Sequence, residues 1–345
     1  MAVRRVEGPT VPGPAEQGSD LAHWIAQVRA QTGRQPGAAG LRQRLVLVTG
    51  GKGGVGKSNF SLNFSLALQE RGRRVLLVDC DSGLGNLDVL LGLCPERHLG
   101  DVVSGRCAVE DALITVPGGL RLLPAASGIE AIGRATAVDV GRLIKALGQL
   151  TAEYDLCVLD SGAGLGPQIR ALLRAAQEIL VVTTPEPTAL ADAYATVKTI
   201  HKDNARALTR LVVNMADGAR DAEAAVRSVT AVCRRFLDWT PEYLGGIPRD
   251  AGVLHAVRQQ RPFLLSAPGS PAARAMRHLA AVFCDETSLA APRSAGLREV
   301  LLSLLRPRAS GAEQEPEPVG DQVFAVGARA GSAPTLHGPR GGAAD

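Results

Sequence analysis

The chain has 345 residues, 46% hydrophobic and 21% charged, with a formal net charge of +4 at pH 7. This length can bury a sizeable core in one large domain or two small ones. Aromatic residues make up only 3%, which argues against a surface that stacks nucleic-acid bases, and the small net charge argues against a DNA-binding face. No stretch reaches the roughly 18 consecutive apolar residues of a membrane-spanning helix, and the N-terminus lacks the apolar core of a secretory signal.

The six cysteines form no CxxC pair. Two of them, Cys80 and Cys157, lie inside apolar runs, where a cysteine usually behaves as a small hydrophobe. We therefore expect a reduced, cytoplasmic chain without a zinc or iron–sulfur site.

The chain divides into four predicted regions. Residues 1–40, rich in Pro, Gly, Ala and Gln, predict a flexible extension with one short helix at 20–31. Residues 41–285 predict an ATPase domain, on evidence that follows. Residues 286–308 predict a C-terminal amphipathic helix region, and residues 309–345 lack periodicity and predict a disordered tail.

Regular alternation of strand and helix patterns begins at residue 45. Helix-period segments at 58–70, 140–152, 189–202, 222–236 and 272–283 separate short apolar runs at 45–49, 75–79, 156–160, 179–184, 210–214 and 243–248. Unbroken apolar runs of this length are typical of strands buried on both faces. The order predicts an α/β fold, with a mainly parallel sheet flanked by helices on both faces.

The first apolar run leads into GGKGGVGKS and then a helix, which is the context of a phosphate-binding P-loop. Glycines turn consecutive backbone N–H groups toward a β-phosphate, and the helix N-terminus adds its positive end. Lys57 would neutralise the β- and γ-phosphates, and the Ser58 hydroxyl would ligate Mg²⁺. A glycine-rich turn without a ligand is the alternative. The predicted nucleotide-binding residues of this loop are Gly51, Lys52, Gly53, Gly54, Val55, Gly56, Lys57 and Ser58.

Three aspartates follow buried strands, where ligand chemistry gathers in parallel sheets. Asp79 ends the run at 75–79, Asp81 follows two residues later, and Asp160 closes LCVLDSGAG in a Walker B pattern that would hold Mg²⁺. Carboxylates this close together repel unless a metal or water lies between them. For Asp81, an acidic helix cap is the competing interpretation.

The base site is indicated by Asn214, which ends VVNMAD. This segment approaches the guanine-reading N-K-x-D motif but has Met215 in place of the lysine, so the pattern favours ATP over GTP.

The segment KGGVGKS (52–58) is similar to the signature of the MinD/ParA superfamily of deviant Walker A P-loop ATPases. That resemblance implies that Lys52 reaches the partner's nucleotide in an ATP-sandwich homodimer, and that Asn86 and Asp88 lie at the dimer interface. It implies that Asn214 and residues 247–250 flank adenine. By the same resemblance the catalytic residues are Asp81, which orients the attacking water, Lys52 and Lys57. The Mg²⁺ ligands are Ser58, Asp79 and Asp160, and the base-site residues are Asn214, Pro248 and Asp250.

Within that superfamily, four segments resemble the FlhG (FleN/YlxH) family of flagellar-number regulators, over about 45–285: residues 79–92, 118–130, 159–164 and 182–198. The resemblance implies a slow regulatory ATPase that dimerises with ATP and controls the number and placement of flagella from the inner face of the cell membrane. It implies a signal-recognition-type GTPase and basal-body proteins as partners, without specific nucleic acid. A division-site regulator and a partition or transcription-linked ATPase remain alternatives.

The N-terminal segment departs from the family pattern, and the C-terminal segment allows two interpretations. The family's N-terminal DQAxxLR element has its nearest match at 20–26, which keeps the Asp and the Ala but lacks the Gln and the Arg, so activation of the GTPase stays open against a short docking helix. Residues 296–308 place four leucines on one face of a helix, with arginines nearer the polar side. Such a helix could bind an anionic membrane interface or pack on its own domain.

Overall fold

In the computed structural model, the described residues are 44–81, 86–124, 150 and 153–286, all within one compact unit, Met1–Gly311. The predictions for residues 1–40, for the helical region after residue 286 and for the terminal tail lie outside them. Among the described helices, none is long and apolar enough to cross a bilayer.

An eight-stranded sheet forms the centre of the unit, in the order β3-β4-β2-β5-β1-β6-β7-β8. Every neighbouring pair is parallel except β3 and β4, which are antiparallel. The strands are β1 (Arg44–Thr49), β2 (Val75–Cys80), β3 (Ile114–Thr115), β4 (Arg121–Leu123), β5 (Leu156–Ser161), β6 (Glu178–Thr183), β7 (Leu208–Ala216) and β8 (Glu242–Pro248). The predicted mainly parallel α/β fold is confirmed.

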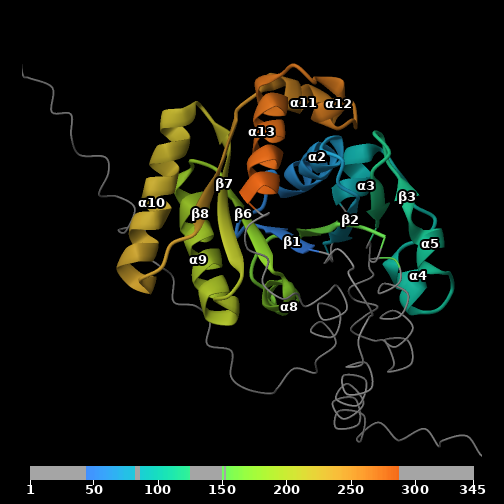
Figure 1. Cartoon of the computed structure of the whole chain (residues 1–345), viewed down its shortest axis with the longest axis horizontal. Coiled ribbons are helices and arrows are strands. Elements are labelled where there is room, and N and C mark those ends of the chain that lie inside the picture. The colour runs from blue at the N-terminus through green and yellow to red at the C-terminus, as the bar shows by residue number, and fades with distance from the viewer. Residues whose placement is uncertain (1–43, 82–85, 125–149, 151–152, 287–345) are drawn as a thin grey trace, which may run out of the picture. The chain divides into compact units, whose positions relative to one another are not determined.

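Helices cover both faces of the sheet (Figure 1). On one side lie α2 (Lys57–Glu70), α11 (Ala251–Arg258), α12 (Phe263–Ser266) and α13 (Pro271–Glu286), and on the other lie α8 (Pro167–Ala175), α9 (Pro187–Asn204) and α10 (Ala219–Leu237). Three short helices, α3 (Asn86–Leu91), α4 (Leu99–Val103) and α5 (Val109–Ala112), lie toward the β3 edge.

Alternate side chains of each central strand enter different halves of the core. Val46 and Val48 of β1 belong to the cluster that contains α2 and α13, and Leu45 and Leu47 are equally buried but lie outside that cluster. Because both faces are covered, these strands are apolar without alternation, as the sequence predicts. In the same cluster the rings of Phe60 and Phe64 stack with centroids 5.1 Å apart, and Phe283 of α13 meets Phe64 edge-on at 5.2 Å.

The predicted runs match six of the eight strands within two residues at every end, and β7 extends two residues beyond its run on each side. Strands β3 and β4 were not predicted, because elements of two and three residues are too short to show periodicity. Helix α8 was also missed. The predicted helix at 140–152 lies almost wholly outside the described residues. Cys80 and Cys157 are buried, as expected.

Candidate ATP-binding and hydrolysis site

The loop between β1 and α2 has a backbone that only glycine accommodates easily. Gly56 immediately precedes α2 in the left-handed region, with φ 88° and ψ 23°, and Gly54 has φ 82°. A Cβ on Gly56 would lie 2.4 Å from Asn214 Nδ2, and one on Gly51 would lie 2.6 Å from the carbonyl oxygen of Asp192 in α9. The loop is therefore pressed against β7 and α9, in the strand–loop–helix context of an anion cradle.

Lys57 is buried at the first position of α2, with 7% of its surface exposed. Its Nζ donates to the carbonyl oxygen of Lys52, 3.3 Å away, inside the loop. Burial lowers the pKa of this amine, and the negative charges of Asp160 and Asp81 oppose that shift. The P-loop lysine thus lies between the loop backbone and two of the predicted site carboxylates.

The second lysine of the loop, Lys52, turns toward the start of α9. Its Nζ lies 2.9 Å from Glu186 Oε2 and 2.8 Å from Thr188 Oγ1. The contact is exposed, with 36% of the Lys52 side chain and 62% of the Glu186 side chain accessible. Both residues lie within 182–198, one of the segments that carry the family resemblance, but the sequence gives neither a role, because an ion pair across 134 positions leaves no local pattern.

Asp79 and Asp160 meet across β2 and β5, where their Cα atoms are register partners. Both carboxyl groups are buried, with 2% and 0% of the residue exposed. Burial raises the pKa of Asp79 to about 7, although a backbone hydrogen bond from Asp81 lowers it, and burial raises the pKa of Asp160 to about 6. Two buried acids side by side are costly to ionise without a cation between or beside them.

The Asp160 carboxylate fits a Mg²⁺ site. Ser61 Oγ lies 2.8 Å from Asp160 Oδ1, and hydrogen bonds from Ser58 and Ser61 lower the pKa of the acid. The second oxygen, Oδ2, is buried and has no hydrogen-bond partner among the described residues. Among the residues that the structure describes, no cluster of three His, Cys, Asp or Glu could hold a metal alone. Mg²⁺ would therefore bind Asp160 and Ser58 and complete its shell with water and phosphate oxygens, as this ion usually does.

Asp81 lies just beyond the end of β2, at the mouth of the site. Its backbone N–H donates to Asp79 Oδ1 at 3.0 Å. A Cβ on Gly162, after β5, would lie 2.8 Å from Asp81 Oδ1, so the carboxylate packs on this glycine, two residues after Asp160. That Asp81 orients the attacking water stays a prediction, and its position beside Gly162 is compatible with that role. Asp88 accepts a hydrogen bond from the N–H of Val89, and its interface role is also untested.

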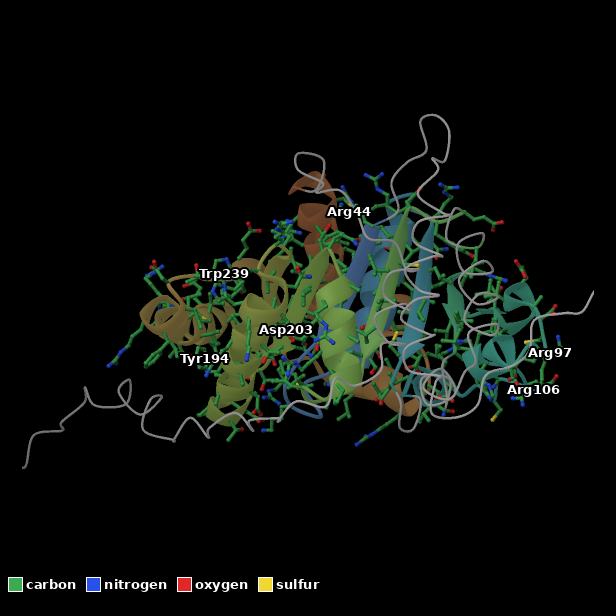
Figure 2. All side chains as sticks on the ribbon, turned by 90° about the horizontal axis from the view of Figure 1, so that it is seen from below. Arg44, Arg97, Arg106, Tyr194, Asp203 and Trp239 are labelled. Atoms are coloured by element: carbon green, nitrogen blue, oxygen red, sulfur yellow. The ribbon has the colours of Figure 1, made fainter. Side chains whose placement is uncertain are left out.

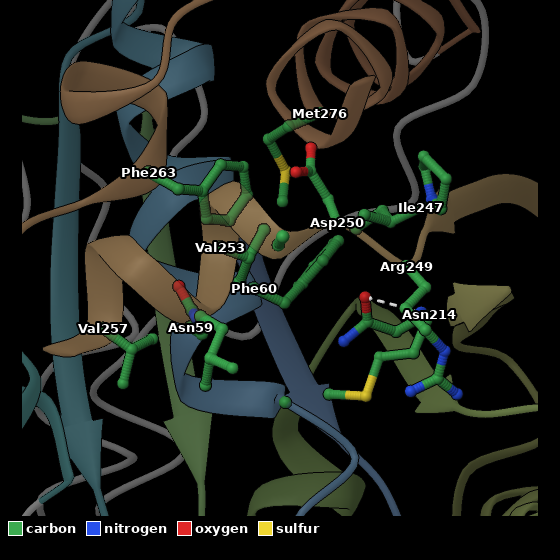
Figure 3. Close-up of a pocket in the computed structure, with 15 residues that line it drawn as sticks. Asn59, Phe60, Asn214, Ile247, Arg249, Asp250, Val253, Val257, Phe263 and Met276 are labelled. Atoms are coloured by element: carbon green, nitrogen blue, oxygen red, sulfur yellow. Dashed lines mark hydrogen bonds between the residues drawn. The ribbon is translucent and has the colours of Figure 1, made fainter. Parts of the chain in front are cut away.

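A cavity of about 500 Å³ opens beside the phosphate loop, where the base of a nucleotide would lie (Figure 3). It is lined by the predicted base-site residues Asn214, Pro248 and Asp250, together with Met215 and Arg249, and by an apolar wall of Phe60, Val253, Phe263 and Met276. The sequence did not single out that wall, because its members come from four separate helices.

The carboxylate of Asp250 is already engaged inside the protein. Its Oδ1 accepts from the N–H of Gly252 at 2.8 Å and its Oδ2 from the N–H of Ala272 at 2.9 Å. Asp250 therefore caps α11 and ties it to the first turn of α13. Reading guanine needs an acceptor for its ring N–H and amino groups, and Asp250 is the one acidic residue among those that line the cavity. The geometry agrees with adenine as the base.

Comparison with known proteins supports the chemistry that this geometry suggests. Residues 43–211 match the family described as an AAA domain. The chain is 43% identical over 237 residues to the antiactivator FleN of Pseudomonas aeruginosa, covering 69% of this chain and 85% of FleN. It is 30% identical to the flagellum site-determining protein YlxH of Helicobacter pylori, covering 76% and 90%. The solved structure of the septum site-determining protein MinD with Mg-ADP from Pyrococcus horikoshii superposes with a TM-score of 0.58 at 26% identity, covering 74% and 99%.

The phosphate loop carries two lysines and lies beside the buried carboxylates of β2 and β5. This arrangement serves the hydrolysis of ATP with Mg²⁺. The chain is a P-loop ATPase of the MinD/ParA type. Its similarity to FleN and YlxH extends over most of their lengths, and within this class the chain belongs to the FlhG family.

Proposed function

We propose that this ATPase is a dimerisation switch that regulates the number and placement of flagella from the cytoplasmic face of the membrane. The relatives named above are an antiactivator and a flagellum site-determining protein, which supports the flagellar role. The observation that carries the switch is the position of Lys52. In the single chain its ammonium group contacts Glu186 and Thr188 at the start of α9.

The weakness of the Lys52 contact favours its use as a switch. An exposed ion pair contributes about 0.2–1 kcal/mol, and the Lys52–Glu186 pair is exposed on both sides. A triphosphate in the partner subunit would offer the same ammonium group charge-assisted hydrogen bonds to an anion of higher charge. ATP would therefore draw Lys52 away from its own α9 and close the homodimer.

Hydrolysis would then reopen the dimer. Bound Mg²⁺ neutralises charge that develops on the phosphate oxygens. Lys57 would bind the β- and γ-phosphates, Ser58 and Asp160 would hold the metal with Asp79 near its shell, and Asp81, which packs on Gly162, would orient the attacking water. Loss of the γ-phosphate removes the anion that holds the partner's Lys52.

Reversible membrane attachment would come from residues 296–308, which lie outside the described residues. A single amphipathic helix with a few arginines binds an anionic interface weakly. An ATP-bound dimer presents two such helices, and the second binds at a high effective concentration. Nucleotide state would thereby set the balance between cytoplasm and membrane.

We propose a partner-binding surface on α9 and α10. Phe236 near the end of α10 is 53% exposed, its ring centroid lies 6.4 Å from that of Tyr194 in α9, and the guanidinium of Arg235 lies over it at 5.2 Å. Lys198 and Lys202 are exposed and follow Tyr194 at intervals of one helical turn. An exposed aromatic ring beside lysine and arginine side chains suits a partner that offers an acidic segment with an apolar anchor residue. We propose that this partner is a basal-body protein. Figure 2 shows Tyr194 and Trp239 on this side of the unit.

The test is recovery of partners from the native host. Protein carrying Asp81→Ala, loaded with ATP, serves as the trapped dimer, and Lys57→Ala serves as the empty-site control. We expect basal-body proteins or the flagellar GTPase to co-purify with the trapped dimer alone. Recovery of a septum inhibitor would indicate that the ATPase regulates the division site. Salt-sensitive recovery of chromosomal DNA would indicate that it acts in partition. Either result would overturn the flagellar role and leave the ATPase intact.

A further inference from the structure

Asn214 lies at the junction of the base cavity and the phosphate loop. It belongs to β7, two residues before the strand ends, and it lines the cavity beside Gly56 (Figure 3). Its Nδ2 donates to the carbonyl oxygen of Val55 in the phosphate loop at 2.9 Å, and its Oδ1 accepts from the N–H of Met215 at 3.0 Å. The side-chain amide of Asn214 therefore connects β7, which borders the base cavity, to the phosphate loop.

Both ends of this connection have demanding backbone geometry. Gly56, the next residue after Val55, is in the left-handed region, and a Cβ there would lie 2.4 Å from Asn214 Nδ2. Met215 has φ 57°, a region that side chains larger than that of Asn or Asp rarely adopt. The hydrogen bond to Asn214 Oδ1 gives the Met215 N–H a partner in this conformation. The amide thus fits between two uncommon backbone conformations and bonds to both segments.

The bond to Val55 bears on phosphate binding. Val55 is 3% exposed, so its carbonyl oxygen has little access to water if the amide is removed. Val55 and Gly56 directly precede Lys57, and their backbone groups form part of the cradle that the glycines shape. A change at Asn214 would reach the phosphate-binding backbone directly, through Val55.

We propose that Asn214 is a positioning residue for the phosphate loop, whose main contribution to nucleotide binding does not depend on the base. An amide offers two donors and two acceptor sites, and one of each is used within the protein. This inference rests on the ATPase assignment and is independent of the flagellar role.

The experiment compares three probes that share a triphosphate and differ in the base: ATP, GTP and inorganic tripolyphosphate. Dissociation constants with Mg²⁺ are measured by calorimetry for the wild-type full chain and for Asn214→Ala. We expect Asn214→Ala to weaken all three by a similar factor of about tenfold, the effect of leaving one buried acceptor unpaired, with the ATP-to-GTP ratio unchanged. Unchanged tripolyphosphate affinity with a loss confined to ATP would make Asn214 a base reader and overturn the proposal.

Asn204→Ala is the matched control. This substitution also removes a side-chain amide that donates to backbone carbonyls, but these belong to Leu173 and Ala176 at the end of α8 and not to the phosphate loop. It is expected to leave tripolyphosphate affinity unchanged, and an equal loss there would contradict the proposal. As a second measurement, amide hydrogen exchange of the nucleotide-free chain should be faster in residues 53–57 of Asn214→Ala than in wild type. Unchanged exchange in that loop would refute the connection, and the amides of α10, remote from the loop, report any loss of overall stability.

Discussion

Asp79 and Asp160 stand side by side at the carboxyl edge of the sheet, because β2 and β5 pair in a register that aligns their Cα atoms. Both are buried, and burial raises their pKa values from 3.8 to about 7 and about 6. The apo protein therefore holds two acids whose ionised forms are disfavoured by their surroundings. That cost is relieved when a divalent cation enters the site.

A pH dependence of stability follows from this pair. Because the folded-state pKa values are raised, the folded chain binds more protons than the unfolded chain between about pH 4 and pH 7. The contribution of these groups to the free energy of unfolding is full below pH 4 and is lost as pH rises through 6 and 7. Urea unfolding of the nucleotide-free protein at pH 5 and pH 8 measures it. Asp79→Asn should flatten the dependence, and an equally steep loss in that variant would exclude Asp79 as its source.

Removing the hydroxyl of Ser61 should weaken Mg²⁺ binding. Ser61→Ala leaves Asp160 Oδ1 without the donor at 2.8 Å, which costs about 1–3 kcal/mol for a buried acceptor and raises the pKa of the acid further. We expect the Mg²⁺ concentration for half-maximal ATP hydrolysis to rise about tenfold, with ATP affinity in EDTA unchanged. Ser65→Ala is the control, since Ser65 is equally buried and bonds to the carbonyl oxygen of Ser61 instead. Equal effects of both substitutions would assign the change to α2 packing.

Substitution of Asp81 should separate nucleotide binding from turnover. Asp81→Ala removes the carboxylate that packs on Gly162 and leaves the phosphate loop untouched. We expect ATP to be bound and hydrolysis to fall by about a hundredfold or more, the usual contribution of a group that acts on the attacking water. Equilibrium nucleotide binding and phosphate release measure the two. Lys57→Ala should abolish binding itself, and normal phosphate release by Asp81→Ala would remove Asp81 from the mechanism.

Loss of Glu186 should favour the closed dimer. Glu186→Ala releases Lys52 from an exposed pair worth about 0.2–1 kcal/mol. The ATP concentration at which half of the protein is dimeric, measured by light scattering, should fall by about two- to fivefold. Lys52→Ala should bind ATP and stay monomeric. A Glu186→Ala protein that no longer dimerises would show that this carboxylate acts in the closed state.

The α9–α10 surface should be needed for partners and dispensable for chemistry. Phe236→Ala removes a ring that is 53% exposed, and Lys198→Glu reverses an exposed charge one turn after Tyr194. Each should reduce capture of basal-body proteins by the trapped dimer about tenfold or more, as expected for an anchor residue of an interface. ATP hydrolysis should stay within about twofold of wild type. Full capture by both variants would place the partner surface elsewhere.

The parts of the site that follow directly along the chain could be predicted from sequence. The glycines, Lys57 and Ser58 are contiguous, and Asp79 and Asp160 end apolar runs. Pairings between residues far apart in the chain could not be predicted from sequence. The register that joins Asp79 to Asp160 needs the strand order, and Ser61 contacts Asp160 across 99 positions without a motif. Asp250 belongs to a segment that the family resemblance indicates. Its hydrogen bond from Gly252 is local, whereas the one from Ala272 depends on where α13 begins.

Helix α9 has contacts with the nucleotide loop at one end and with the proposed partner surface farther along. Glu186 and Thr188 at its start hold Lys52, and the carbonyl of Asp192 backs Gly51. Tyr194, which meets Phe236, lies only seven residues after Pro187, about 10 Å along the axis. The helix is continuous between these contacts. A protein that bound its outer side and displaced it would shift Lys52 and Gly51 together, and would thereby change the rate of hydrolysis without entering the active site.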